Sequence, residues 1–208
     1  MANRNYQNDY PSVTQVLVIL RKPGLENWFK YNSAQFCNAE SSKGKQIGTE
    51  IHDAIQSHIE KREVKIETQY GEEVATALKS FMLFRKEHPE IKLIKSEIQL
   101  TSLIWGYNGT MDVSGRIEPD IVPGDWKSGK AKDEDKPKIY PEHIYQVASY
   151  LKVYNEVTHS EAKKAFIAVF AKDKVAYNYR LIEEQVINEV FDEVFLPCLK
   201  IHNYQRRK

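Results

Sequence analysis

The sequence has few cysteines, no long apolar run and no excess of charge of one sign. Two cysteines in 208 residues, Cys37 and Cys198, are too few for a four-thiolate zinc or iron–sulfur site and too far apart for a CxxC redox pair, so we interpret both as buried thiols. No window approaches the ~18 consecutive apolar residues of a membrane span. A net charge of +1 excludes general polycation behaviour, so contact with a nucleic acid would require a local basic groove.

The remaining composition is typical of a globular protein. The chain is 41% hydrophobic and 28% charged, with 12 Tyr, 8 Phe and 3 Trp spread along its length, which argues against disorder, coiled coil and collagen-like structure. At roughly 150 residues per domain, the length predicts a single domain over residues 1–208. The first ten residues are polar and lack the features of a signal or transit peptide, so a cytoplasmic location is expected.

Residues 1–90 carry helical patterns. Ser12 marks the start of a short helix, and Pro23-Gly24 interrupts the pattern before a second amphipathic segment. Apolar residues then recur at intervals of three and four, which predicts longer helices over about 43–61 and 72–87. Loops are expected from composition around residues 41–45, 67–71 and 129–137.

From Ile91 the apolar period changes to two, which predicts strands. The resulting order of helices, three strands, a helix, two strands and a helix predicts an α/β or α+β sheet domain. Residues 91–182 would form the sheet core with an inserted helix, and 183–208 a C-terminal helix with a basic tail. The expected strands span 91–101, 107–113, 121–127, 165–170 and 175–181, and the expected helices span 141–154 and 183–202.

Two acidic residues and a lysine lie on neighbouring predicted strands. Asp125 and Lys127 point to the same face, about 6.6 Å apart along the strand. Alone, such a pair is typical of a surface ion pair. A meander would place Asp112 beside Asp125, and two carboxylates this close are unfavourable without a cation such as Mg²⁺. The pattern therefore favours a metal site, although Pro123, which lacks a ladder donor, leaves the register of the third strand open.

Four further polar residues have both a structural and a functional interpretation. His52, at the edge of its helix's apolar stripe, is either a boundary residue of the core or a metal ligand. Glu97 is either a solvent-facing strand residue or a further acid of the site. Gln146 and Tyr150, four apart on one helix face, form either a polar helix edge or part of the site.

In combination, these residues resemble the RecB-like branch of the PD-(D/E)XK nuclease superfamily. The motifs appear in the family's order, on compatible elements. They are GTEIH at 48–52, SEIQL at 96–100, GTMD at 109–112, DWK at 125–127 and QVASY at 146–150. The segment PSVTQVL at 11–17 is also similar to the start of the mitochondrial genome maintenance exonuclease and of related phage and CRISPR-adaptation nucleases.

The resemblance implies a restriction-endonuclease-like core, with a mixed central sheet flanked by helices, and hydrolysis of DNA phosphodiester bonds that depends on Mg²⁺ or Mn²⁺. Iron–sulfur members of this branch use four cysteines, so no cluster is expected here. The implied ligands of the cation are His52, Asp112, Asp125 and the backbone carbonyl of Trp126.

The resemblance also implies roles for the other residues of the motifs. Lys127 would orient or activate the attacking water, as a catalytic residue beside Asp112 and Asp125. Glu97 would act as a further acid, and Gln146 and Tyr150 would hold the site or the DNA strand.

The expected partner is DNA, with single-stranded ends favoured, and no membrane is expected. Lysines that follow the DWK motif favour a DNA groove, but interleaved acidic residues are equally typical of a solvated face. This basic set comprises Lys127, Lys130, Lys132, Lys136 and Lys138, with Arg206, Arg207 and Lys208 at the chain end. Trp28, Phe29, Tyr31, Trp105 and Tyr107 either stack on bases or pack in the core.

Two other functions fit the same sequence. One is a non-catalytic DNA-binding or assembly module with this fold, against which the intact Asp112, Asp125 and Lys127 argue. The other is a structure-selective endonuclease or an RNA-directed nuclease, because the choice of substrate depends on helices and loops that narrow the channel.

Overall fold

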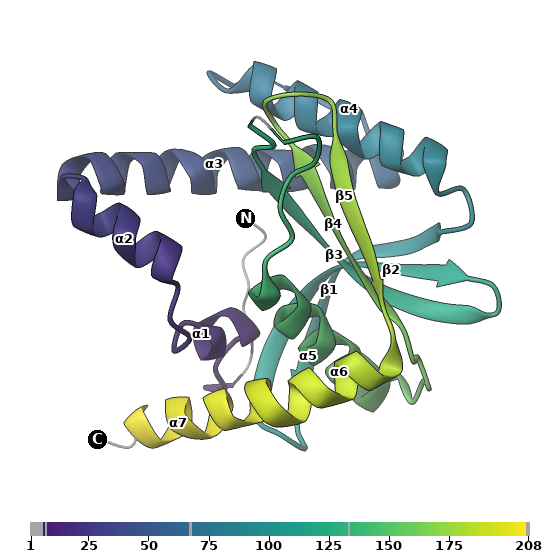
Figure 1. Cartoon of the computed structure of the whole chain (residues 1–208). Coiled ribbons are helices and arrows are strands. Elements are labelled where there is room, and N and C mark those ends of the chain that lie inside the picture. The colour runs from purple at the N-terminus through teal and green to yellow at the C-terminus, as the bar shows by residue number, and fades with distance from the viewer. Residues whose placement is uncertain (1–5, 7, 67, 133, 207–208) are drawn as a thin grey trace.

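The computed structural model describes residue 6 and residues 8–66, 68–132 and 134–206. These residues form a mixed five-stranded sheet with helices against both faces (Figure 1), which confirms the predicted α/β class. The strands lie side by side in chain order; β3 and β4 pair in parallel, and the other neighbours are antiparallel. The strands are β1 (Lys92–Ser102), β2 (Tyr107–Ile117), β3 (Asp120–Gly129), β4 (Ala165–Ala171) and β5 (Tyr177–Ile182).

Helices precede, separate and follow these strands. They are α1 (Val13–Leu17), α2 (Pro23–Tyr31), α3 (Ala34–Ile59), α4 (Gly71–Glu87), α5 (Pro141–Thr158), α6 (Glu184–Val190), the π-helical turn η1 (Phe191–Phe195) and α7 (Leu196–Arg206). The predicted starts of the first two helices are confirmed, because Ser12 caps α1 through the amide of Gln15 and Pro23 opens α2. Within the described residues, no helix combines the length and hydropathy that crossing a membrane requires.

Helix α3 begins earlier than the sequence pattern predicts. Ser33 caps it by accepting a hydrogen bond from the Phe36 amide at 3.3 Å, and the buried side chain of Cys37 anchors its first turns. The loop expected at residues 41–45 is therefore wrong: this polar stretch, with Gly44, lies inside the helix, because tertiary contacts on either side override weak local propensity. In the loop expected at 67–71, Gly71 already begins α4, and Glu67 lies outside the described residues.

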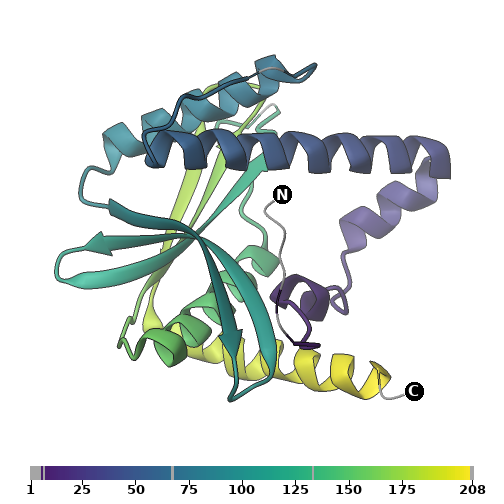
Figure 2. The ribbon, with the colours of Figure 1, turned by 180° about the vertical axis from the view of Figure 1, so that it is seen from behind.

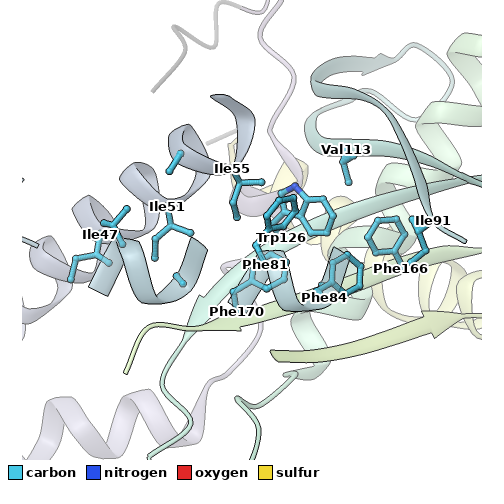
Figure 3. Packing of buried hydrophobic residues seen from close by; sticks show 14 of the residues in the cluster. Ile47, Ile51, Ile55, Phe81, Phe84, Ile91, Val113, Trp126, Phe166 and Phe170 are labelled. Carbon is cyan, nitrogen blue, oxygen red and sulfur yellow. The ribbon is translucent and has the colours of Figure 1, made fainter. Parts of the chain in front are cut away.

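Alternate residues of the central strands face two separate hydrophobic layers. Trp126 of β3 and Phe166 and Phe170 of β4 face α3 and α4, where Phe81 and Phe84 meet the Trp126 ring edge-on at centroid distances of 5.9 Å (Figure 3). Edge-to-face aromatic pairs of this kind contribute about 0.5–1.5 kcal/mol each beyond their buried area. The opposite layer packs β4 against α5 and α6. Asp125 and Lys127 alternate with Trp126, so they face the α5 side.

The halves of β1 and β2 next to the turn that joins them form a third hydrophobic cluster, with α1, α5, η1 and α7. Tyr107 is fully buried there and donates a hydrogen bond from its hydroxyl to the Ser149 carbonyl at 2.8 Å, and Trp105 packs on Phe191. These two aromatic residues therefore have the core-packing role and not the base-stacking one. By contrast, Phe29 and Tyr31 of α2 remain exposed.

Candidate active site

The candidate site lies where the two central strands separate. β2 and β3 pair from Ile117 and Asp120 as far as Val113 and Gly124. Beyond that point β1 is the only strand that β2 pairs with, and β4 is the only strand that β3 pairs with, among the described residues. Figure 2 shows β1 and β2 curving away from the other strands. Asp112 and Asp125 are the next residues along the two strands, just past the last paired residues, and each carboxyl group interacts with the other, as the predicted meander requires. They are 5% and 1% exposed.

The strand fork determines the contacts of Asp112. Past the fork, the backbone amide of Trp126 donates a hydrogen bond to Asp112 Oδ2 at 2.8 Å. The side chain of Asp112 thus accepts a hydrogen bond that a main-chain carbonyl of β2 would accept if the two strands stayed paired. Asp112 Oδ1 lies 3.5 Å from Nδ1 of His52. His52 reaches this point because Ile51 and Ile55 hold α3 against the sheet. Asp112 is therefore fixed by contacts from both β3 and α3.

Glu97 is placed by an unusual backbone conformation. The pairs Ser96–Val113 and Ile98–Met111 put it opposite Asp112 on the neighbouring strand, and its φ is +49°. A left-handed conformation at a non-glycine residue costs about 1–3 kcal/mol, and such residues cluster at functional sites. The conformation brings the Glu97 carboxylate to the fork.

Three of these side chains form a compact group of possible metal ligands. One ligand atom from each of His52, Glu97 and Asp112 lies within 4.8 Å of the other two. Imidazole and carboxylate donors suit a divalent cation such as Mg²⁺ or Mn²⁺. The carboxylate of Asp125 is turned to Lys127, whose ammonium donates to Asp125 Oδ2 and, at 3.2 Å, to the carbonyl of Trp126.

The two aspartates have opposite proton affinities. Burial and the adjacent Asp112 charge raise the pKa of Asp125 to about 8, although Lys127 opposes this. Burial also acts to raise the pKa of Asp112, but the charge and hydrogen bond of His52 outweigh it and lower the pKa below its usual range. Burial acts to lower the pKa of His52, and the charge of Asp112 instead raises it. The metal-free site thus favours the ionised form of Asp112 and the protonated form of Asp125.

Helix α5 supplies the remaining predicted residues. Gln146 Nε2 donates to the hydroxyl of Tyr150 at 2.7 Å, and the Tyr150 ring packs against β2. Gly109 of the GTMD motif leaves room for the aromatic ring, because a Cβ atom at this position would lie 2.7 Å from Tyr150 Cε1. Gly109 and Tyr150 are thus matched in shape.

Lys130 is not part of this group. It is exposed in the loop after β3, where Asp173 accepts hydrogen bonds from the amides of Ala131 and Lys132 at 3.0 and 2.9 Å. Of the basic chain end, Arg206 contacts the carbonyl of Asp9, whereas Arg207 and Lys208 lie outside the described residues.

The sequence interpretation missed His143. This half-buried side chain lies in the first turn of α5; burial first, and then the charge of Lys127, lowers its pKa to about 4. The sequence did contain a signal for it, because His143 lies three residues before Gln146 and therefore on the same face of the helix.

Comparisons with known proteins give similarity of structure only. No family model and no curated protein matches the chain. Among solved structures, a candidate exonuclease from Eubacterium rectale matches with a TM-score of 0.55 and 16% identity, over 98% of this chain and 86% of that one. An alkaline exonuclease from Laribacter hongkongensis matches with a TM-score of 0.46 and 15% identity, over 95% of this chain and 92% of that one. The chain therefore shares its overall fold with the first of these proteins.

Proposed function

We propose that this protein is a metal-dependent deoxyribonuclease. The observation that supports the proposal most strongly is the pair of buried aspartates at the strand fork, with His52 on one and Lys127 on the other. Two buried carboxylates side by side are unfavourable without a cation, and carboxyl groups with strongly perturbed pKa values cluster at functional sites. The fold and the order of the RecB-like motifs are consistent with the same activity.

The donor set fits a hard divalent cation. We infer that His52, Asp112, Asp125 and the carbonyl of Trp126 hold Mg²⁺ or Mn²⁺, with Glu97 as a further acid. When bound, such a cation neutralises phosphate charge and lowers the pKa of a coordinated water. It also offsets the repulsion that raises the pKa of Asp125.

Lys127 is proposed to orient the attacking water and to bind a phosphate oxygen of the DNA. Its ammonium already lies between the Asp125 carboxylate and the Trp126 carbonyl, so it can turn toward a phosphate without a change in the backbone. Gln146 and Tyr150 hold the α5 side of the site, and exposed Lys130 is the proposed contact for the neighbouring backbone phosphate.

The proposed substrate is single-stranded DNA with a free end, cut by an exonuclease reaction. The test is incubation of the protein with linear and circular single-stranded DNA, duplex DNA and RNA, each in Mg²⁺, Mn²⁺ and EDTA. Cleavage of linear single strands in Mg²⁺ or Mn²⁺, but not in EDTA, is expected. Rapid cleavage of closed circles would exclude a strict requirement for ends. DNA binding without cleavage in either metal would instead indicate a non-catalytic module.

A further inference from the structure

A cavity of about 800 Å³ lies between α2 and the start of α5. One wall is the segment 20–25 with Trp28, and the other is the segment 140–143 with Tyr145. The volume falls within the range of about 300–1,000 Å³ that is typical of small-molecule sites. None of these residues has a role in the metal site described above.

Helix α2 presents an apolar face that the protein itself does not cover. Leu25, Trp28 and Phe29 recur at helical spacing, yet none of the α2 residues, all of which the structure describes, is buried. The helix runs from α1 to the start of α3, apart from the sheet (Figure 1). An amphipathic helix normally buries its apolar stripe against a core. Here Trp28 and Leu25 line the cavity instead, which suits an apolar ligand.

The charges around the cavity are already neutralised. Lys22 lies 3.5 Å from Glu142 across the two walls, and Arg21 lies 2.6 Å from Glu26. Together these four side chains carry no net positive charge that would select a phosphate. The aromatic rings of Trp28, Tyr140 and Tyr145 offer surfaces on which a flat, uncharged ring stacks.

The cavity adjoins the candidate active site along α5. The amide of Tyr140 donates to Nδ1 of His143 at 3.3 Å, which leaves the proton of the neutral imidazole on Nε2. His143 lies near Lys127, and Gln146 follows on the same helix face, about 4.5 Å further along the axis. His143 lines the cavity and is close enough to Lys127 to respond to its charge, so the cavity adjoins the place where Lys127 would hold a phosphate.

We propose that the cavity between α2 and α5 binds one unpaired nucleobase of the DNA strand being cut, stacked on Trp28 and Tyr140. This inference rests on the proposed nuclease function and explains a preference for single strands. A base in a duplex is paired and stacked between neighbours, and extruding it costs a few kcal/mol.

The test compares an ordinary single-stranded oligonucleotide with a fully abasic one of the same length, which keeps the phosphates and lacks the bases. Affinity is measured in EDTA, so that no cleavage occurs, for the wild type, Trp28→Ala, Tyr140→Ala and the control Tyr31→Ala. Tyr31 is an exposed aromatic residue of α2 that does not line the cavity.

The wild type and Tyr31→Ala should prefer the ordinary strand. Trp28→Ala and Tyr140→Ala should bind that strand about tenfold more weakly, the order expected for one stacked base, with unchanged affinity for the abasic strand. Each of these two variants should also show a smaller preference for single-stranded over duplex DNA than the wild type does. Equal weakening toward both oligonucleotides, or no difference from Tyr31→Ala, would overturn the inference and leave the nuclease proposal intact. If the folded wild type neither binds nor cuts DNA, the nuclease proposal fails and this inference fails with it.

Discussion

Asp112 and Asp125 occupy the same fork, yet their surroundings favour different protonation states. Asp112 accepts a backbone hydrogen bond and faces His52, so its ionised form stabilises the fold. Asp125 is buried against a second carboxylate, so its ionised form is disfavoured. The two residues should therefore respond differently to the same substitution.

We expect Asp112→Asn to destabilise the metal-free protein by about 1–3 kcal/mol, because a charge-assisted hydrogen bond and an ion pair are lost. Asp125→Asn should leave stability unchanged or raise it, because the amide replaces a carboxyl group that is protonated near pH 7. Urea unfolding in EDTA measures both. Equal destabilisation by the two substitutions would contradict the assigned protonation states.

Lys127→Ala should retain metal binding and lose turnover. The substitution removes the group proposed to position the water and leaves the carboxylates; it also removes a positive charge that repels a cation at short range. The test is single-turnover cleavage of a single-stranded oligonucleotide alongside Mn²⁺ titration. Near-normal cleavage by a folded variant would leave Lys127 as a hydrogen-bonding partner of Asp125 with no part in the reaction.

At the scale of elements, two residues in the middle of β3, Pro123 and Gly124, fit the neighbours that the strand has at those positions. Pairing with β4 begins at Gly124, so Pro123 lies where β3 contacts only β2, and its missing donor interrupts no ladder on the β4 side. At Gly124 a Cβ atom would lie 2.2 Å from the ring of Phe166. The glycine lets the aromatic layer under Trp126 pack closely against the strand.

Gly124→Ala should therefore destabilise the protein by about 1–3 kcal/mol through overpacking. Gly44→Ala is the matched control: it lies inside α3, where a Cβ atom would have no neighbour within 4 Å among the described residues. There, alanine should stabilise by up to about 1 kcal/mol. Thermal unfolding tests both substitutions, and each kcal/mol of changed stability should shift the Tm by about 2–4 °C. A loss of stability in Gly44→Ala, or none in Gly124→Ala, would contradict this packing.

Local periodicity predicted most elements, because β1 to β5, α4 and α5 carry regular apolar patterns. It failed where tertiary contacts decide, as in residues 41–45 of α3, which are helical despite a loop-like composition. The position of Asp112 beside Asp125 followed from the predicted meander. The positive φ of Glu97 and the exposed face of α2 had no sequence signal, because both depend on how distant elements approach one another.

At the scale of the whole molecule, the site should make metal-free stability fall as pH rises from about 6.5 to 8. The folded protein keeps the Asp125 proton up to a pKa of about 8, whereas the unfolded chain releases it near pH 4, so this contribution is lost as pH rises. His52, whose pKa is raised, acts in the same direction. Below about pH 6.5 the lowered pKa of His143 acts in the opposite direction.

This pH dependence is measured by urea unfolding in EDTA, with Asp125→Asn as the comparison. The slope between pH 6.5 and 8 should be shallower in the variant, because it lacks the carboxyl group. A wild-type curve parallel to that of Asp125→Asn would show that the carboxyl group titrates normally in the folded state. Saturating Mg²⁺ should stabilise the wild type most at the upper end of this range, where Asp125 releases its proton most easily.

The central claim is that the paired aspartates form a metal-dependent site that hydrolyses DNA. The most direct measurement is single-turnover cleavage of a linear single-stranded oligonucleotide in Mg²⁺ by the wild type, Asp112→Asn and Asp125→Asn, with an EDTA control. We expect cleavage by the wild type alone, and a loss in each folded variant of more than about 100-fold, beyond the 10–100-fold typical of residues that only orient metal ligands. Cleavage in EDTA, or near-normal cleavage by either folded variant, would contradict the claim.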